Sequence, residues 1–328
     1  MLIAADMRSV LSSAFLATSL TASLLAGCSS DPQTGPYRLV TTVELPAEAI
    51  PPKQLDEVGA ALREFAATPG TTLLELAKEH GVTAVAEVRE LPTALSSRLE
   101  GWITDEILKA RFEGKTIPEY TDQIAGLARM ALTRFAVESE LALDGDVRTH
   151  AITGLDLGPA GLDVRAAIQA AEGETLMQQP EIAVDAAGAL SLGDQRFGLA
   201  YGTHAWQGID AASAHVFGGA VREALGASID CARVASAVAA QCLLGVCVGK
   251  EPQLREVCEG GLDALVKVTR DQLAAVEIDE LHFSQGTATV VDEDGDGTGD
   301  RIADGVWQAE LTLGGVALGA KATFVGER

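Results

Sequence analysis

The chain has 328 residues, with 24 Lys and Arg against 47 Asp and Glu, and a formal net charge of −23. A surface this acidic repels nucleic-acid phosphates and anionic lipid headgroups, which excludes both as partners of the folded part. Aromatic residues make up only 4% of the chain, which argues against a large aromatic platform for ligands. The length is enough for one large domain or two modest ones.

The N-terminal segment has the features of an export signal. Its apolar run, residues 10–24, is too short and too rich in Ser and Thr for a membrane-spanning helix, which needs about 20 apolar residues. The run ends in Leu25-Ala26-Gly27-Cys28, which resembles the lipobox of bacterial lipoproteins. This resemblance implies that residues 1–27 are a signal peptide and that Cys28 is the lipidation site, bearing acyl chains such as palmitate.

The same resemblance implies a location. In lipoproteins of Gram-negative bacteria, sorting depends on the residue after the cysteine, and aspartate there retains the protein in the inner membrane. Ser29 occupies that position, so we expect a lipid-anchored cell-envelope protein of the outer membrane if the host is Gram-negative. The residues that follow are small and polar and include two prolines. We therefore expect residues 28–44 to be a lipidated tether and lead-in.

Residues 45–135 have the spacing of amphipathic helices. The apolar residues Leu55, Val58, Leu62 and Phe65 share one helical face after a Pro-Pro pair. A second long apolar face, with the same spacing, follows Pro118. We therefore predict a compact helical region over residues 45–135.

The period changes to alternation in residues 136–328, which predicts strands. A hairpin is expected around Gly145. Further strands are expected over residues 182–184, 189–192, 197–201, 278–283, 287–291, 306–313 and 316–325. Helical spacing returns in residues 203–276. We predict an α+β fold in which the middle and terminal strands form one antiparallel sheet or a partly closed β-barrel. Residues 203–276 would be a helical insertion within it.

Four cysteines remain once Cys28 is set aside: Cys231, Cys242, Cys247 and Cys258. An even number in an exported chain predicts two disulfides, for which three pairings are open. The alternative, a zinc site, lacks a CxxC pair and a nearby histidine. If Cys231 and Cys258 lie on two antiparallel helices, a nested pairing follows, with Cys231–Cys258 outside and Cys242–Cys247 inside.

The run 292–300, Asp-Glu-Asp-Gly-Asp-Gly-Thr-Gly-Asp, has closely spaced carboxylates around a glycine turn. Calcium takes six to eight oxygen ligands of this kind. The run resembles the loops of EF-hands, dockerins and thrombospondin type 3 repeats, but Ala303 stands where EF-hands have a bidentate glutamate. We expect a structural calcium ion, and the alternative is a solvated turn. The expected ligands are Asp292, Asp294, Asp296, Thr298, Asp300 and Asp304.

Catalytic motifs are missing from the sequence. It contains no GxSxG elbow and no HExxH pair, and its five histidines are scattered. No catalytic residue is therefore proposed, and we expect a non-enzymatic binding or scaffolding role in the cell envelope. Two alternatives stay open: a carrier of a hydrophobic ligand, and an envelope enzyme whose site is assembled from distant residues. The interior of the β region, whether filled, hollow or acidic, distinguishes them.

Overall fold

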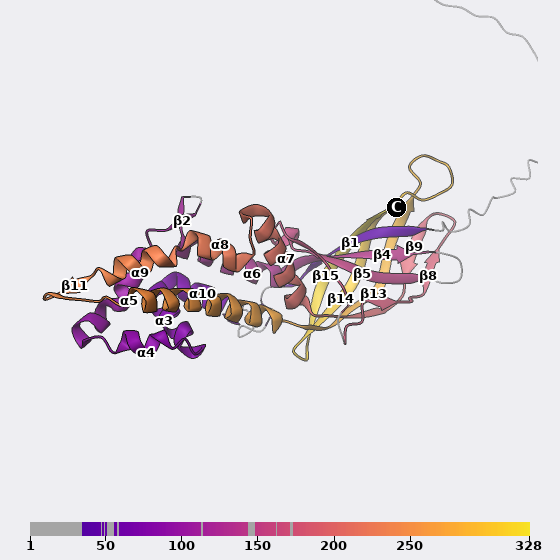
Figure 1. Cartoon of the computed structure of the whole chain (residues 1–328). Helices are drawn as coiled ribbons and strands as arrows, with labels where there is room; N and C mark the ends of the chain where they lie inside the picture. The colour runs from indigo at the N-terminus through magenta and orange to yellow at the C-terminus, as the bar shows by residue number, and fades with distance from the viewer. Residues whose placement is uncertain are drawn as a thin grey trace, which may run out of the picture.

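The computed structural model describes residues 35–46, 48, 50, 56–57, 59–112, 114–143, 148–161, 163–170 and 173–328. The expected signal peptide and the lipidation site Cys28 therefore lie outside the described residues. The molecule is elongated, with helices at one end and a β-sheet at the other (Figure 1). Each end has its own hydrophobic core. No helix among the described residues combines the length and the apolar character needed to cross a bilayer.

The helical end is built from two stretches of the chain. The first contains α2 (Ala60–Ala67), α3 (Pro69–Glu79), α4 (Ala84–Arg89), α5 (Thr93–Ile107) and α6 (Ile117–Thr133). The second, within the expected insertion, contains α7 (Tyr201–Phe217), α8 (Val221–Ser228), α9 (Cys231–Ala239) and α10 (Glu251–Ala274). Two short hairpins interrupt them: β2 (Arg111–Phe112) with β3 (Lys115–Thr116), and β11 (Cys242–Leu243) with β12 (Val246–Cys247).

Helix α10 is the central helix of this end, since it contacts α2, α3, α4, α7, α8 and α9. Its buried face includes Leu254, Leu262 and Leu265, at the spacing of an amphipathic helix. Gly261 lets α3 approach closely, because a side chain there would lie 2.7 Å from the carbonyl oxygen of Leu73.

The strands of the other end form one antiparallel sheet. They are β1 (Pro36–Glu44), β4 (Arg134–Ala142), β5 (Thr149–Asp156), β6 (Arg165–Ala167), β7 (Met177–Gln178), β8 (Ile182–Val184), β9 (Ala189–Leu192), β10 (Gln195–Leu199), β13 (Ile278–Val291), β14 (Arg301–Leu313) and β15 (Val316–Glu327). The order across the sheet is β6-β5-β4-β1-β15-β14-β13-β9-β8, with β7 on β5 and β10 on β13. Middle and terminal strands thus share one sheet, and the α+β class is confirmed.

Strand β1 occupies the second half of residues 28–44, the expected tether and lead-in. Tyr37, Leu39 and Val43 are buried and alternate with outward-facing residues, which is the period of a strand with one buried face. The strand lies between β4 and β15. The N-terminal part of the described chain therefore joins the middle strands to the terminal ones.

Aromatic side chains fill the part of the sheet interior around Trp307. The Trp307 ring centroid lies 5.2 Å from that of Phe283 and 5.0 Å from that of Phe324. Gly286 and Gly305 provide the space, because a Cβ at Gly286 would lie 2.2 Å from the indole and one at Gly305 would lie 2.5 Å from the Phe324 ring. These rings and the two glycines therefore form a tightly packed part of the sheet core.

Candidate functional site: an apolar cavity between the helices

An apolar cavity of about 360 Å³ lies where helices from both stretches of the chain meet. Ile124 of α6, Trp206 and Ile209 of α7, Leu225 of α8 and Leu273 of α10 form much of its wall. Its volume falls in the range of small-molecule sites, about 300–1,000 Å³. It is therefore large enough for a small ligand.

The helical period explains why these side chains converge. In α7, Trp206, Ile209 and Ser213 are spaced by three and four residues and so share one face. In α6, Thr121 and Ile124 do the same. Several of the large lining side chains are only partly buried, because the apolar faces of the helices meet around the cavity instead of closing on one another.

The Ser and Thr hydroxyl groups in the wall are already occupied as donors. Thr121 donates to the Pro118 carbonyl at 3.0 Å, Ser213 to Gly219 at 3.0 Å, and Thr269 to Leu265 at 2.8 Å. Ser228 likewise donates to a carbonyl of its own helix. Among the described lining residues there is no Asp, Glu, His, Lys or Arg. The cavity can thus hold an apolar molecule, and it offers no group for acid–base chemistry other than a tyrosine.

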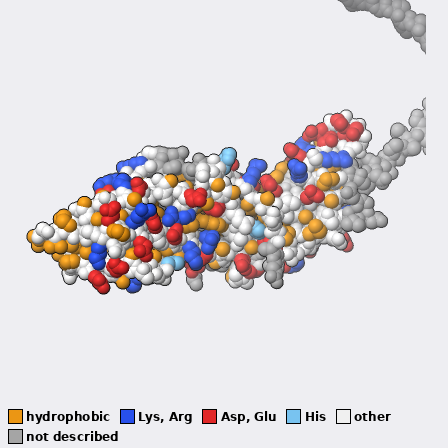
Figure 2. All heavy atoms as spheres, in the orientation of Figure 1, with side chains coloured by type: hydrophobic (Ala, Val, Ile, Leu, Met, Phe, Trp, Pro, Cys, Tyr) orange, Lys and Arg blue, Asp and Glu red, His pale blue; other side chains and the backbone are white. Residues whose placement is uncertain are grey.

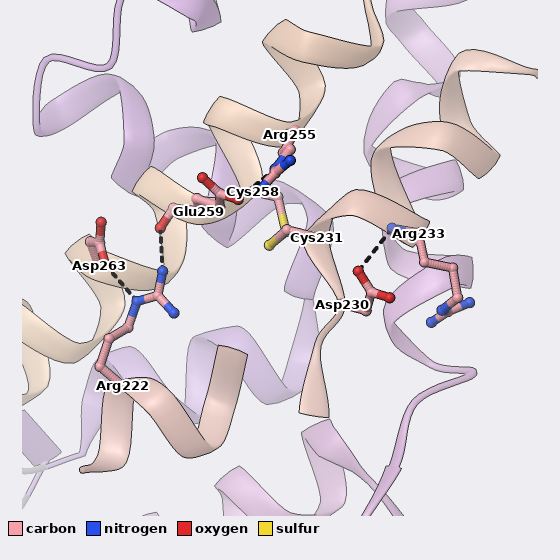
Figure 3. The surroundings of a disulfide bond; sticks show 8 residues. All are labelled: Arg222, Asp230, Cys231, Arg233, Arg255, Cys258, Glu259 and Asp263. Carbon is pink, nitrogen blue, oxygen red and sulfur yellow. Dashed lines mark hydrogen bonds and ion pairs between the residues drawn. A yellow bond between two sulfur atoms is a disulfide. The ribbon is translucent and has the colours of Figure 1, made fainter. Parts of the chain in front are cut away.

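Helix α8 forms part of the cavity wall and is held in place by polar contacts. None of its residues is fully buried, although Val221 and Leu225 face the cavity. On its outer side, Arg222 donates to the Asp263 carboxylate and, at 3.3 Å, to the Glu259 carbonyl, both on α10 (Figure 3). These two contacts hold α8 over the cavity from the outside.

The two disulfides have the nested arrangement, and the outer one lies next to this wall. Cys231 at the start of α9 is bonded to Cys258 of α10, with the Cα atoms 5.6 Å apart (Figure 3). Cys242 is bonded to Cys247 across the β11–β12 hairpin. All four cysteines are paired, so the zinc alternative is excluded. The outer disulfide fixes the chain directly after α8 to α10.

The acidic loop connects β13 to β14 at the opposite end of the molecule (Figure 1). Oxygen atoms of Asp292, Asp294 and Asp300 all lie within 4.8 Å of one another, close enough to share one cation. The carboxylates of two other expected ligands, Asp296 and Asp304, are not part of this group. Asp296 accepts a hydrogen bond from the Thr298 N–H, at 2.7 Å.

Within the acidic loop, the pKa values of Asp292 and Asp294 are shifted in opposite directions. The pKa of Asp292 is lowered, because the Gly297 and Gly295 N–H groups donate to its carboxylate. The Asp296 N–H also donates to Asp294, but desolvation and the carboxylates of Asp296, Asp300 and Asp292 outweigh it and raise the pKa of Asp294. This repulsion is of the kind that a bound cation would relieve.

The loop is tied to both ends of the described chain. The Tyr37 hydroxyl of β1 donates to the Gly299 carbonyl at 2.9 Å, and the Arg328 N–H donates to the Asp300 carbonyl at 3.0 Å. The loop therefore stands at the end of the molecule where the described chain begins.

A buried Ser-His-Gln group lies in the sheet core and escaped the sequence analysis. Ser139 Oγ is 2.7 Å from His150 Nε2, and His150 Nδ1 contacts Gln195 Oε1. The pairing resembles a nucleophile and its base, but each side chain is at most 2% exposed. Substrate cannot reach it, so the group has a structural role. The signal in the sequence was a histidine at an inward position of an alternating strand.

His204 and Trp206 lie two residues apart in α7 and have different surroundings. His204 is buried and its Nε2 lies 2.8 Å from the Glu174 carboxylate, whereas Trp206 lines the cavity.

Comparison with protein-family models, curated proteins and solved structures found no match to this chain. Its function is therefore inferred from the geometry of its own residues.

Proposed function

We propose that this protein is a lipid-anchored cell-envelope protein that binds an apolar molecule between its helices without catalysing a reaction. The observation that carries the proposal is the cavity, whose wall is apolar and whose Ser and Thr hydroxyls already donate to carbonyls. A polar ligand would lose its hydrogen bonds to water there and gain few in return. An apolar ligand loses none.

The proposal places the ligand among the helices, because the sheet interior around Trp307 is packed with aromatic rings. The anchor at Cys28 and the outer-membrane location remain part of the proposal and rest on the lipobox resemblance. We also propose that the sheet is a partly closed barrel. Residues 175–178 support this, because they bond to β5 on one side and to β10 on the other.

Filling the cavity should weaken binding of an apolar probe. Ala212 of α7 lines the cavity, so Ala212→Phe places a ring in the space that a ligand would occupy. We expect affinity for N-phenyl-1-naphthylamine, an uncharged apolar fluorophore, to fall at least about tenfold, the effect of losing one well-packed apolar contact. Fluorescence titration of the purified protein measures it.

The neighbouring Ala211 is exposed on the same helix and supplies the control. Ala211→Phe adds the same ring to the outer face and should leave the affinity at the wild-type value. Equal affinity in both variants, or no binding of the probe by the wild type, would rule out the cavity as a ligand site.

For the acidic loop we propose a structural calcium ion held by Asp292, Asp294 and Asp300. Because calcium would bind only the folded loop, millimolar Ca²⁺ should raise Tm by several degrees relative to chelator. Asp294→Asn should remove this response. Glu293→Gln makes the same change of charge in the same loop, outside the group of three carboxylates, and should keep it. Identical melting curves of the wild type with Ca²⁺ and with chelator would mean that the loop is a solvated turn.

A further inference from the structure

The β11–β12 hairpin forms the extreme tip of the helical end (Figure 1). Leu243 faces Val246 across the hairpin, and the turn between them is Leu244-Gly245. Leu243 packs partly against the helical core, whereas Leu244 is 94% exposed and Val246 is 52% exposed. The tip therefore presents apolar side chains to the surroundings that neither the core nor the cavity uses.

The turn places Leu244 in a left-handed backbone conformation, which is unfavourable for leucine. Leu244 has φ 52° and Gly245 has φ 80°, and a two-residue turn with both residues left-handed favours Asn-Gly or Asp-Gly. A leucine in this conformation is strained, because its Cβ approaches the following carbonyl oxygen. A strained and almost fully exposed leucine does nothing for the fold, which indicates that the side chain serves a contact outside it.

The disulfide holds this turn in place. Cys242 and Cys247 are facing residues of the hairpin and are bonded to each other. A two-stranded hairpin of this size is marginally stable by itself. The bond therefore keeps Leu244 presented at the tip.

The tip is also the uncharged part of a strongly acidic molecule. Between Arg233 and Lys250 the sequence has no Asp, Glu, Lys, Arg or His, in a chain of net charge −23. In Figure 2 the left end of the molecule is orange and white, without the red and blue of the surface behind it. Because charged groups enter hydrocarbon only at high cost, this tip can approach an apolar phase with the smallest electrostatic penalty.

We propose that the β11–β12 tip is a membrane-contact site, which inserts Leu244 and Val246 into the interfacial layer of a zwitterionic lipid bilayer. Two exposed side chains on a convex hairpin fall far short of the roughly 800 Å² that each partner contributes to a stable protein interface. Shallow insertion below the headgroups needs only a few apolar side chains. Anionic lipids would repel the acidic surface behind the tip.

This contact is separate from the proposed anchor at Cys28. The described part of the chain begins at β1, beside the acidic loop, at the opposite end of the molecule from the tip (Figure 1). Between the two ends run α10, with 24 residues and a length of about 36 Å, and β13, with 14 residues and a length of about 46 Å. The tip thus lies at the opposite end of the molecule from the first described strand.

Binding to phosphatidylcholine vesicles tests the proposal, with the chain from Ser29 onward, which lacks Cys28 and keeps every described residue. We expect the protein to sediment with the vesicles and Leu244→Asn to weaken binding at least about tenfold. Asparagine suits the left-handed turn, so this variant should melt at or above the wild-type temperature. A loss of binding would then not be a loss of fold.

Met177, 61% exposed on the sheet, provides the matched control, and Met177→Asn should bind vesicles as the wild type does. Adding phosphatidylglycerol to the vesicles should weaken binding at low salt, with recovery at high salt. The proposal is overturned if the wild type does not bind, or if Leu244→Asn binds equally well. It is also overturned if Leu244→Asn instead converts a wild-type dimer in solution into a monomer, since the tip would then contact a second copy.

Discussion

Removing the Cys231–Cys258 disulfide should lower the free energy of unfolding by about 3–4 kcal/mol. The bond closes a loop with a sequence separation of 27, and the loss of loop entropy in the unfolded chain sets this magnitude. Because the bond also fixes α9 to α10 directly after α8, opening it should loosen the α8 wall of the cavity. Urea unfolding of the Cys231→Ser, Cys258→Ser double variant measures the first effect, and titration with the apolar probe measures the second.

The second disulfide provides the comparison. Cys242–Cys247 has a sequence separation of only 5, so the Cys242→Ser, Cys247→Ser variant should lose only about 2 kcal/mol. Its hairpin lies at the tip, away from the cavity lining, and the affinity for the probe should stay unchanged. Equal stability losses in the two double variants would show that loop entropy does not govern the contribution of these bonds.

Acid should destabilise the protein through His150. Burial lowers the pKa of this histidine from 6.5 to about 4, and only partly is this offset by its hydrogen bond to Gln195. The folded state therefore keeps the ring neutral, while the unfolded state takes up a proton below pH 6.5. The stabilisation is complete above pH 6.5, and about 1.4 kcal/mol is lost for each pH unit below it, up to about 3 kcal/mol near pH 4.

Urea unfolding between pH 7.5 and pH 5 measures this slope. His150→Gln removes the titrating ring and should flatten the slope over this range, whatever its stability at pH 7.5. Phe197, whose ring centroid lies 5.4 Å from that of His150, supplies the control. Phe197→Leu should lower the stability at every pH and keep the wild-type slope. A wild-type slope in His150→Gln would assign the acid sensitivity to other groups.

Local patterns in the sequence determined a large part of this structure. Alternation predicted the hairpin of β4 and β5 and the terminal strands, because one face of a half-buried strand contacts the core and the other contacts water. The spacing of apolar residues predicted the helices for the same reason. The number of cysteines predicted two disulfides, and the run after Val291 predicted carboxylates crowded around a turn. In each case the information lies within a few neighbouring residues.

Only the tertiary structure decided the features that carry the proposed function. The cavity joins Ile124, Trp206, Leu225 and Leu273, and periodicity shows that each helix has an apolar face without showing which face it meets. His150, Ser139 and Gln195 likewise meet only through the register of β4, β5 and the strands beyond. A cavity exists where several apolar faces fail to close on one another. That depends on how α10 sets the positions of the helices around it, which no single segment of the sequence contains.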